Sequence, residues 1–235
     1  MKKDVVIAGS IIVLCGFLAV FIILYSAKIE KQEEDIIQVS LHKCVDGDTA
    51  WFKTKDGIKK YRFLGIDAPE VDEEYGTIAS DYTCDALKNA KNIEIEYDKV
   101  GKKIDKYNRE LVWIYVDNEL LENKLLDLGY AKIKYIYANY DYLTNLYKSE
   151  KNAKNTKSGL WKDYVEKVYN NYYTITLDYT YKNDVIRVLE NSNLVNIKNP
   201  YKNGCRFVGW LDNNYLFDLS TNIKKDYKLK ASFEC

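Results

Sequence analysis

Two short stretches of the sequence place acidic residues close to an arginine. The first is Val45-Asp46-Gly47-Asp48-Thr49, and the second runs from Arg62 to Asp67-Ala68-Pro69-Glu70. Carboxylates that converge repel one another unless a cation lies between them, and their oxygens suit a hard cation such as Ca²⁺ or Mg²⁺. Each stretch on its own is more typical of a turn. Because the two occur together with Arg62, they indicate a metal site that acts on phosphate.

Arginine is scarce in this chain, which makes its positions informative. Only four of the 35 basic residues are Arg, and two of these are Arg62 and Arg109, the second at the end of a lysine-rich loop. A planar guanidinium binds phosphate oxygens through two parallel hydrogen bonds, which lysine cannot do. A surface salt bridge is the alternative for both, but lysine would have served there. A cation, a spare glutamate and two arginines suit the attack of water on a phosphodiester.

The overall composition excludes several classes of protein. Of the 235 residues 47% are hydrophobic and 30% are charged, which is too apolar for a disordered protein and too charged for a multi-span membrane protein. Basic and acidic residues number 35 each, so net charge does not indicate a nucleic-acid partner. His42 is the only histidine, which excludes His-rich zinc sites and other chemistry that needs two.

The acidic stretches lie in a segment that we expect to be α+β, with a small barrel and helices. Hydrophobic periodicity predicts strands or extended segments at 39–45, 49–54, 58–66, 93–97, 111–116 and 131–137, and helices at about 77–90, 119–128 and 141–157. Lys55-Asp56-Gly57 is a hairpin turn signal. Pairing about Asp56 puts Asp48 opposite about residue 65, with Asp67 a diagonal step away.

The first 27 residues are expected to cross a membrane. Residues 5–27 carry no charge, and as a helix they would reach about 34 Å, enough for a hydrocarbon core of about 30 Å. Lys2 and Lys3 precede them, which leaves the amino terminus in the cytoplasm and the rest of the chain outside. Tyr25-Ser26-Ala27 is a mediocre cleavage site, so we favour an uncleaved anchor. Secretion after signal cleavage is the alternative.

The rest of the chain divides by composition into four parts. Residues 28–37 read as a polar stalk, 38–162 as the domain that holds the acidic stretches, 163–171 as a linker, and 172–235 as a small strand-rich domain.

Four cysteines lie outside the apolar segment, where disulfides are possible. The pairing that respects the predicted domains joins Cys44 to Cys84 and Cys205 to Cys235. Four independent thiols remain the alternative.

Residues 38–162 resemble the staphylococcal nuclease (thermonuclease) family. The resemblance rests on three motifs in the family's order and spacing: 46–49, 62–70 and Asp105-Lys106-Tyr107-Asn108-Arg109. It continues through Gly129-Tyr130-Ala131-Lys132 to Gly159-Leu160-Trp161. It implies a five-stranded OB-type barrel with three helices, which agrees with the predicted elements. It also implies a Ca²⁺-dependent extracellular nuclease that cuts DNA and RNA with little sequence specificity and leaves 3′-phosphate ends.

The resemblance implies a role for each matching residue around the cation. Asp48 and Asp67 match the carboxylates that bind Ca²⁺, and Ala68 matches a residue that binds it through the backbone carbonyl. Glu70 matches the general base that activates the attacking water. Asp46 is expected to support the metal ligands without binding the cation itself.

The resemblance also implies the residues that hold the substrate. Arg62 and Arg109 match the two arginines that clamp the scissile phosphate. Lys106 and Tyr107 match residues that bind the neighbouring terminal phosphate. Tyr135 matches a tyrosine that stacks near the base, which suits sequence-tolerant binding of single strands.

The carboxy-terminal segment resembles a second family. Residues 199–210, 216–221 and 228–231 are similar to the internalin-type B repeat, a small β-grasp-like module of secreted and surface proteins. The resemblance implies a spacer or an adhesion module, and we assign no chemistry to it.

These observations predict a membrane-anchored phosphodiester hydrolase at the cell surface. We expect DNA and RNA as substrates, with single strands preferred because residues 71–74 beside the site are largely acidic. We expect Ca²⁺ as the only cofactor, no small-molecule cofactor, and a monomer. The alternative is a catalytically weak or inactive surface protein that binds nucleic acid or mediates adhesion. The presence of every charged residue of the family site favours the hydrolase.

Overall fold

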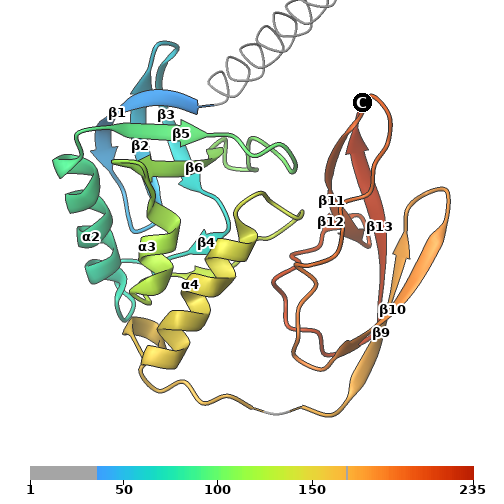
Figure 1. Ribbon diagram of the computed structural model, residues 1–235. Coiled ribbons are helices and arrows are strands. Elements are labelled where there is room, and N and C mark those ends of the chain that lie inside the picture. Colours follow the sequence, from blue (N-terminus) through green and yellow to red (C-terminus); the bar gives the residue numbers. More distant parts are fainter. Residues whose placement is uncertain (1–35, 168) are drawn as a thin grey trace, which may run out of the picture. The chain divides into compact units, whose positions relative to one another are not determined.

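Figure 1 shows the computed structural model of the chain, which describes residues 36–167 and 169–235. The predicted membrane anchor at 1–27 and residues 28–35 of the predicted stalk lie outside the described residues. Within the described ranges, no helix has both the length and the apolar character needed to cross a bilayer.

The first sheet closes into a five-stranded barrel. The strand order is β3-β2-β1-β5-β6, and β3 also pairs in parallel with β6, which joins the two ends. Closure pairs the edges that an open sheet would expose. A short strand, β7, extends the sheet beside β6. The bounds are β1 Ile36–Cys44, β2 Thr49–Thr54, β3 Gly57–Phe63, β5 Ile93–Glu96, β6 Glu110–Val116 and β7 Glu119–Leu120. The predicted barrel is confirmed.

Alternating apolar residues fill the barrel. Ala50 and Phe52 on β2 and Tyr61 and Phe63 on β3 are buried, as the two-residue period of a strand requires. Trp113 on β6 is also fully buried, and its indole nitrogen donates a hydrogen bond to an aspartate in the loop after β5. The barrel is therefore a packed core, and polar chemistry is left to its ends and loops.

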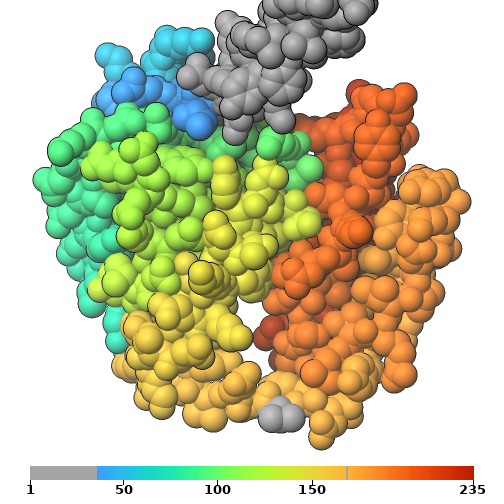
Figure 2. All heavy atoms as spheres, in the orientation of Figure 1, coloured from blue at the N-terminus to red at the C-terminus, as the bar shows by residue number. Residues whose placement is uncertain are grey.

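Three α-helices of the described chain accompany the barrel, as predicted (Figure 1). Their bounds are α2 Gly76–Asn89, α3 Leu121–Asp127 and α4 Leu143–Thr156. Helix α4 packs on α3. In Figure 2 the yellow atoms of α4 lie directly against the green atoms of the preceding part of the chain. After α4, a short 3₁₀ turn at Gly159–Trp161 folds back, and the amide of Leu160 donates to the carbonyl of Gly129.

The hairpin register differs from the predicted one. Thr49 pairs with Arg62, and the amide of Phe63 donates to the carbonyl of Asp48 at 2.9 Å. Asp48 therefore lies opposite Phe63 and not residue 65. The predicted strand at 58–66 ends at Phe63 because Gly65 takes a left-handed turn, with φ +72°.

Two other elements are shorter than predicted. The predicted helix at 119–128 begins at Leu121, because the two residues before it pair with β6 as strand β7. The predicted extended segment at 131–137 is a strand only at Lys132–Ile133, named β8, because Tyr135 adopts a left-handed conformation with φ 61°. Strand β8 pairs antiparallel with β4, Ile66–Asp67.

The carboxy-terminal segment forms a second sheet of five strands in the order β10-β9-β13-β11-β12. Strands β13 and β9 run parallel, and the other neighbours are antiparallel. The bounds are β9 Tyr172–Asp178, β10 Asn183–Leu189, β11 Arg206–Asp212, β12 Tyr215–Leu216 and β13 Tyr227–Glu234. The β-rich character is confirmed, whereas the β-grasp-like architecture stays a prediction. Both sheets belong to one compact unit, Gln38–Cys235.

Candidate active site

Two predicted carboxylates converge on one arginine at the end of β3. Arg62 is buried, and its Nη2 lies 2.8 Å from Oδ2 of Asp48 and 3.3 Å from Oδ1 of Asp67. Its Nη1 donates to the carbonyl of Phe63 at 2.7 Å. Asp48 precedes β2 and Asp67 ends β4, so the hairpin and the short strand after it bring the two acidic stretches together.

Asp48 is the most buried carboxylate of this group. Its Oδ2 accepts the amide of Ala68 at 2.8 Å, and its Oδ1 accepts the hydroxyl of Thr49 at 3.0 Å. Burial raises the pKa of Asp48 to about 6, although the positive charge of Arg62 lowers it. The ionised form is thus only partly compensated by protein groups, and a further cation bound beside Asp48 would stabilise it.

A lysine that the sequence analysis did not single out completes this cluster. Lys134 Nζ lies 2.9 Å from Oδ2 of Asp67. The pairing of β4 with β8, in which Asp67 faces Lys132, carries Lys134 into reach. The ring of Tyr135 lies 5.8 Å from Cζ of Arg62 and 5.0 Å from Nζ of Lys134. The predicted base-stacking residue therefore lies beside the predicted phosphate clamp.

The donors around Arg62 are oxygens, as a hard cation requires. Within the part of the chain that the structure describes, no group of three or more His, Cys, Asp or Glu side chains forms a metal-binding cluster. Asp48 and Asp67 nevertheless point to one positive centre. Ca²⁺ takes six to eight oxygen ligands, including backbone carbonyls and water. The two carboxylates supply oxygens of the kind that such an ion takes, and backbone carbonyls, water and substrate phosphate would have to supply the rest.

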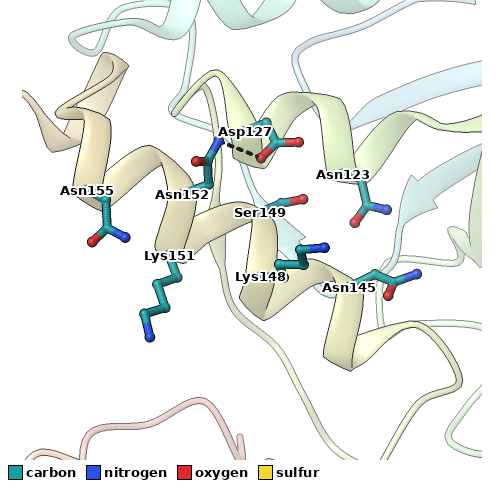
Figure 3. Close-up of a pocket in the computed structure, with 8 residues that line it drawn as sticks. All are labelled: Asn123, Asp127, Asn145, Lys148, Ser149, Lys151, Asn152 and Asn155. Atoms are coloured by element: carbon teal, nitrogen blue, oxygen red, sulfur yellow. Dashed lines mark hydrogen bonds between the residues drawn. The ribbon is translucent and has the colours of Figure 1, made fainter.

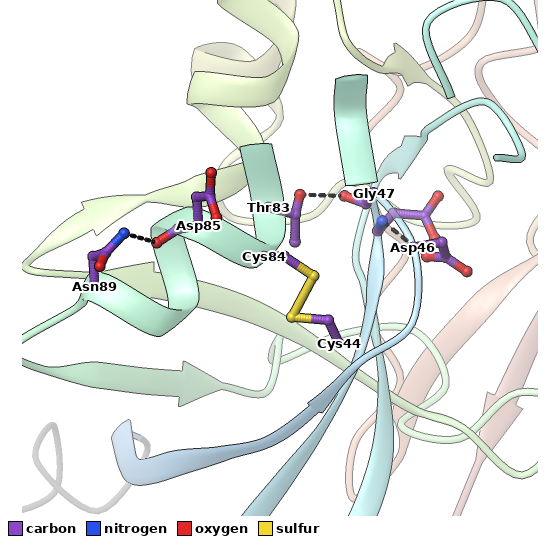
Figure 4. The surroundings of a disulfide bond; sticks show 8 residues. Cys44, Asp46, Gly47, Thr83, Cys84, Asp85 and Asn89 are labelled. Carbon is purple, nitrogen blue, oxygen red and sulfur yellow. Dashed lines mark hydrogen bonds between the residues drawn. A yellow bond between two sulfur atoms is a disulfide. The ribbon is translucent and has the colours of Figure 1, made fainter. Parts of the chain in front are cut away.

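Helix α2 holds the acidic loop between β1 and β2 in place. Figure 4 shows the hydroxyl of Thr83 directed at the carbonyl of Gly47, to which it donates at 2.8 Å, and the disulfide between Cys44 and Cys84 beside it. A Cβ on Gly47 would lie 2.7 Å from the Cβ of Ala68, so only glycine fits there. The predicted disulfide pairing is confirmed here and for Cys205 with Cys235.

The other residue of this loop that was predicted to matter is Asp46. Its Oδ1 accepts the amide of Asp48 at 3.1 Å, and it makes no ion pair with Arg62. Asp46 therefore shapes the loop that presents Asp48, which agrees with a supporting role.

Glu70 lies in an exposed turn between β4 and α2. Its amide donates to a carboxylate oxygen of Glu73 at 3.0 Å, and its carbonyl accepts the amide of Glu73 at 2.8 Å. A Cβ on Gly76 would lie 1.7 Å from this carbonyl oxygen. Because Gly76 has no side chain, α2 can begin in direct contact with the backbone of Glu70. The residue Glu70 itself is exposed to solvent.

A second cluster lies in the loop before β6. Nε of Arg109 donates to Oδ2 of Asp105 at 2.7 Å, and Oδ1 of Asp105 accepts the amides of Tyr107 and Arg109, each at 2.9 Å. Burial alone would raise the pKa of Asp105, but these hydrogen bonds outweigh it and the pKa is lowered. The ring of Tyr107 is 68% exposed and lies 4.9 Å from Nζ of Lys106 and 5.4 Å from Cζ of Arg109.

The barrel brings the two clusters to neighbouring strands. Strands β3 and β6 are parallel, with Arg62 opposite Leu111, so Arg109 precedes β6 close to the level of Arg62. Among the described residues, no hydrogen bond or ion pair links Arg109 or Glu70 directly to the Arg62 cluster. The structure therefore joins Asp48, Asp67, Ala68, Arg62 and Tyr135 by contact, whereas the other predicted residues lie in separate loops.

A polar groove between α3 and α4 is a separate feature. Asn152 donates to a carboxylate oxygen of Asp127 at 3.3 Å across it (Figure 3). It is lined by Asn123, Asp127, Asn145, Lys148, Ser149, Lys151, Asn152 and Asn155. None of the predicted site residues lies in it, so it does not belong to the candidate active site.

Comparison with known proteins adds independent information. Residues 60–163 match the family described as "Staphylococcal nuclease homologue". The chain is 34% identical over 135 residues to the SPbeta prophage-derived endonuclease YokF of Bacillus subtilis (strain 168), a match that covers 54% of this chain and 45% of that protein. It is 34% identical over 126 residues to the thermonuclease of Staphylococcus hyicus, covering 51% of this chain and 72% of the relative.

A third relative is endonuclease YncB of Bacillus subtilis (strain 168), which is 31% identical over 138 residues. That match covers 56% of this chain and 64% of the relative. The match thus spans less than half of the first relative, 72% of the second and 64% of the third.

Proposed function

The chain belongs to the staphylococcal nuclease family, and on this premise we propose that it is a Ca²⁺-dependent nuclease that hydrolyses phosphodiester bonds of DNA and RNA. One observation carries the proposal: Asp48 and Asp67 converge on Arg62, at the positions that the family motifs assign to the cation and the phosphate clamp. We propose that Arg109, Glu70 and Tyr107 act on the same phosphate from the neighbouring loops.

Each proposed catalytic residue has a distinct task. Arg109 is anchored through Nε to Asp105, which leaves the outer face of its guanidinium for two oxygens of one phosphate. Arg62 is held by carboxylates on one side and supplies the second positive charge to the phosphorane-like transition state. Glu70 is exposed and accepts a proton from the attacking water. When bound, Ca²⁺ supplies charge stabilisation at the phosphate.

The substrate is proposed to be DNA or RNA of any sequence, with single strands preferred. Tyr107 and Tyr135 are exposed, and each ring lies beside a positive side chain. Such pairs suit single-stranded nucleic acid, because the ring can stack on a base while the positive side chain binds a phosphate. Stacking reads no hydrogen-bond pattern, so little sequence specificity follows. We propose that cleavage leaves the phosphate on the 3′ end.

The setting of the site is also part of the proposal. We propose that residues 1–27 anchor a monomer in the cell membrane with residues 38–235 outside, and secretion after signal cleavage is the alternative. The two disulfides support an oxidising location. We further propose that residues 172–235 are an internalin-type B repeat module that acts as a spacer or adhesion element.

The test uses the full-length chain with three substrates. Single-stranded DNA, duplex DNA and RNA are incubated with Ca²⁺ or with a chelator, and product length and end groups are measured. We expect cleavage of all three, fastest for single-stranded DNA, with 3′-phosphate ends. Binding without cleavage would support the alternative, an inactive nucleic-acid-binding protein, and 5′-phosphate ends would contradict the proposed direction of attack.

Removing the Cys44–Cys84 disulfide is expected to lower both the stability of the fold and the apparent affinity for Ca²⁺. The bond closes a 40-residue separation, so its loss costs about 4 kcal/mol of unfolding free energy in the chain-entropy estimate. It also ties the strand before the acidic loop to α2. In the Cys44→Ser/Cys84→Ser variant, we expect a higher Ca²⁺ concentration for half-maximal cleavage.

The matched control is Cys205→Ser/Cys235→Ser, which removes a disulfide of similar span, 30 residues, from the second sheet. We expect a comparable loss of stability in denaturant but an unchanged Ca²⁺ requirement. Equal Ca²⁺ requirements in the two double variants would show that the first disulfide acts only on overall stability.

A further inference from the structure

Asp218, in the loop between β12 and β13, accepts hydrogen bonds from the backbone at Tyr135. Oδ2 of Asp218 accepts the amide of Tyr135 at 2.7 Å, and Oδ1 accepts the amide of Ile136 at 2.8 Å. The same Oδ1 accepts the amide and the hydroxyl of Ser220 at 2.9 and 2.6 Å. Hydrogen bonds to a carboxylate are stronger than those between neutral groups. Hydrogen bonds from Ser220 therefore orient the carboxylate of Asp218, which binds two successive amides of the barrel domain.

These two amides lie where the backbone needs support. Tyr135 has φ 61°, which is uncommon for a bulky residue. A conformation of this kind persists only where its surroundings hold it. It interrupts the extended segment after β8 and turns the ring of Tyr135 toward Arg62 and Lys134.

Neighbouring contacts show that Asp218 belongs to a continuous junction. The amide of Leu219 donates to the carbonyl of Ile136, and both side chains are fully buried. Asn199 accepts the amide of Asn139 at 2.8 Å and donates to its carbonyl at 3.0 Å. Two loops of the carboxy-terminal segment therefore form hydrogen bonds with residues 135–139, one near each end.

We propose that Asp218 is a positioning residue that holds the Tyr135 ring beside Arg62, so that the second sheet helps to form the base-stacking surface of the nuclease site. This rests on the proposed function, because the ring gains its role from a nucleic-acid substrate. It gives the carboxy-terminal module a part in substrate binding, acting through Tyr135 without touching the substrate itself.

The test separates substrate binding from the chemical step. For Asp218→Ala in the full-length chain, we expect KM for a single-stranded oligonucleotide to rise about fivefold, part of what one base stack contributes. We expect kcat to stay within about twofold, since the clamp and the base are untouched. Asp218→Asn keeps the size of the side chain but turns one acceptor toward the amides into a donor, and we expect the same rise in KM.

The control is Asp226→Ala, which removes a carboxylate that accepts the amide of Thr174 within the second sheet. We expect KM and kcat of this variant to match the wild type. In the Tyr135→Ala background, Asp218→Ala should add no further rise in KM, because both changes remove one effect. The proposal would be overturned if the two substitutions raised KM independently, so that their factors multiplied in the double variant. It would also be overturned if KM were unchanged in a folded Asp218→Ala protein.

Hydrogen exchange of the peptide that contains Tyr135 and Ile136 is measured in parallel, without substrate. We expect faster exchange in Asp218→Ala than in Asp226→Ala, and equal exchange would contradict the positioning role. If the wild type neither cuts nor binds the oligonucleotide, the proposed function fails, and a stacking role for Tyr135 fails with it. Cleavage by the wild type together with equal exchange would overturn only the role of Asp218.

Discussion

Replacing Arg109 with lysine is expected to lower kcat on a single-stranded oligonucleotide by about 10²- to 10³-fold, the loss typical of one missing transition-state donor. The structure gives the reason. Nε of Arg109 is used by Asp105 at 2.7 Å, and the described residues place no hydrogen-bond partner on its two outer nitrogens. A lysine has a single ammonium group, which cannot stay anchored to Asp105 and also bind two phosphate oxygens.

The matched control for this change is Arg206→Lys. Arg206 also forms an ion pair with an acidic residue, Glu234, but it belongs to strand β11 of the second sheet and is none of the predicted site residues. We expect its kcat to equal that of the wild type. An Arg109→Lys protein with normal kcat would remove Arg109 from the proposed mechanism.

Glu70→Gln is expected to lower kcat by about 10²- to 10⁴-fold, the range that general acid–base catalysis contributes. Glutamine keeps the shape of the side chain and cannot accept a proton from water. The turn around Glu70 should persist, because its hydrogen bonds to Glu73 use the backbone of Glu70 and not its carboxylate. A rate measurement at saturating substrate and Ca²⁺ isolates the chemical step.

The comparison for this variant is Glu74→Gln, four residues further along the same acidic segment. Glu74 is exposed and pairs with Lys162. Loss of this surface ion pair should leave kcat unchanged and stability nearly so, because solvent screens an exposed pair. If Glu70→Gln and Glu74→Gln behaved alike, Glu70 would not be the general base.

Much of the barrel could be predicted from the sequence because local patterns encode it. The two-residue alternation of β2 and β3 marks their buried faces, and the turn signal between them marks the hairpin. The exact register could not be predicted, since Lys55-Asp56 and Asp56-Gly57 are both acceptable turn centres. Moving the turn centre by one residue changes the partner of Asp48 by two, from residue 65 to Phe63.

The sequence predicts which residues form the candidate site better than it predicts how they are arranged. The motifs pointed to Asp48, Asp67 and Arg62, and the structure brings their charged groups together. Lys134 was missed because its place beside Asp67 depends on the pairing of two very short strands, β4 and β8. Such two-residue strands leave no periodic signal in the sequence.

The conformation of Tyr135 could not be predicted for a similar reason. Residues 131–137 read locally as an extended segment, and the left-handed residue within it, Tyr135, is hydrogen-bonded through its amide to Asp218, more than 80 residues away. Long-range hydrogen bonds of this kind override local preference. The sequence offers only the aspartate in a loop of the second sheet, without a sign of its partner.

The most direct test of the central claim is the initial rate of cleavage of a single-stranded oligonucleotide at increasing Ca²⁺, after treatment with chelator. Wild type and Asp48→Asn are measured side by side with full-length protein. We predict no cleavage in chelator, recovery of the wild-type rate as Ca²⁺ is added back, and a higher Ca²⁺ requirement for Asp48→Asn. Cleavage that continues in chelator, or a wild-type protein that stays inert in excess Ca²⁺, would contradict the account.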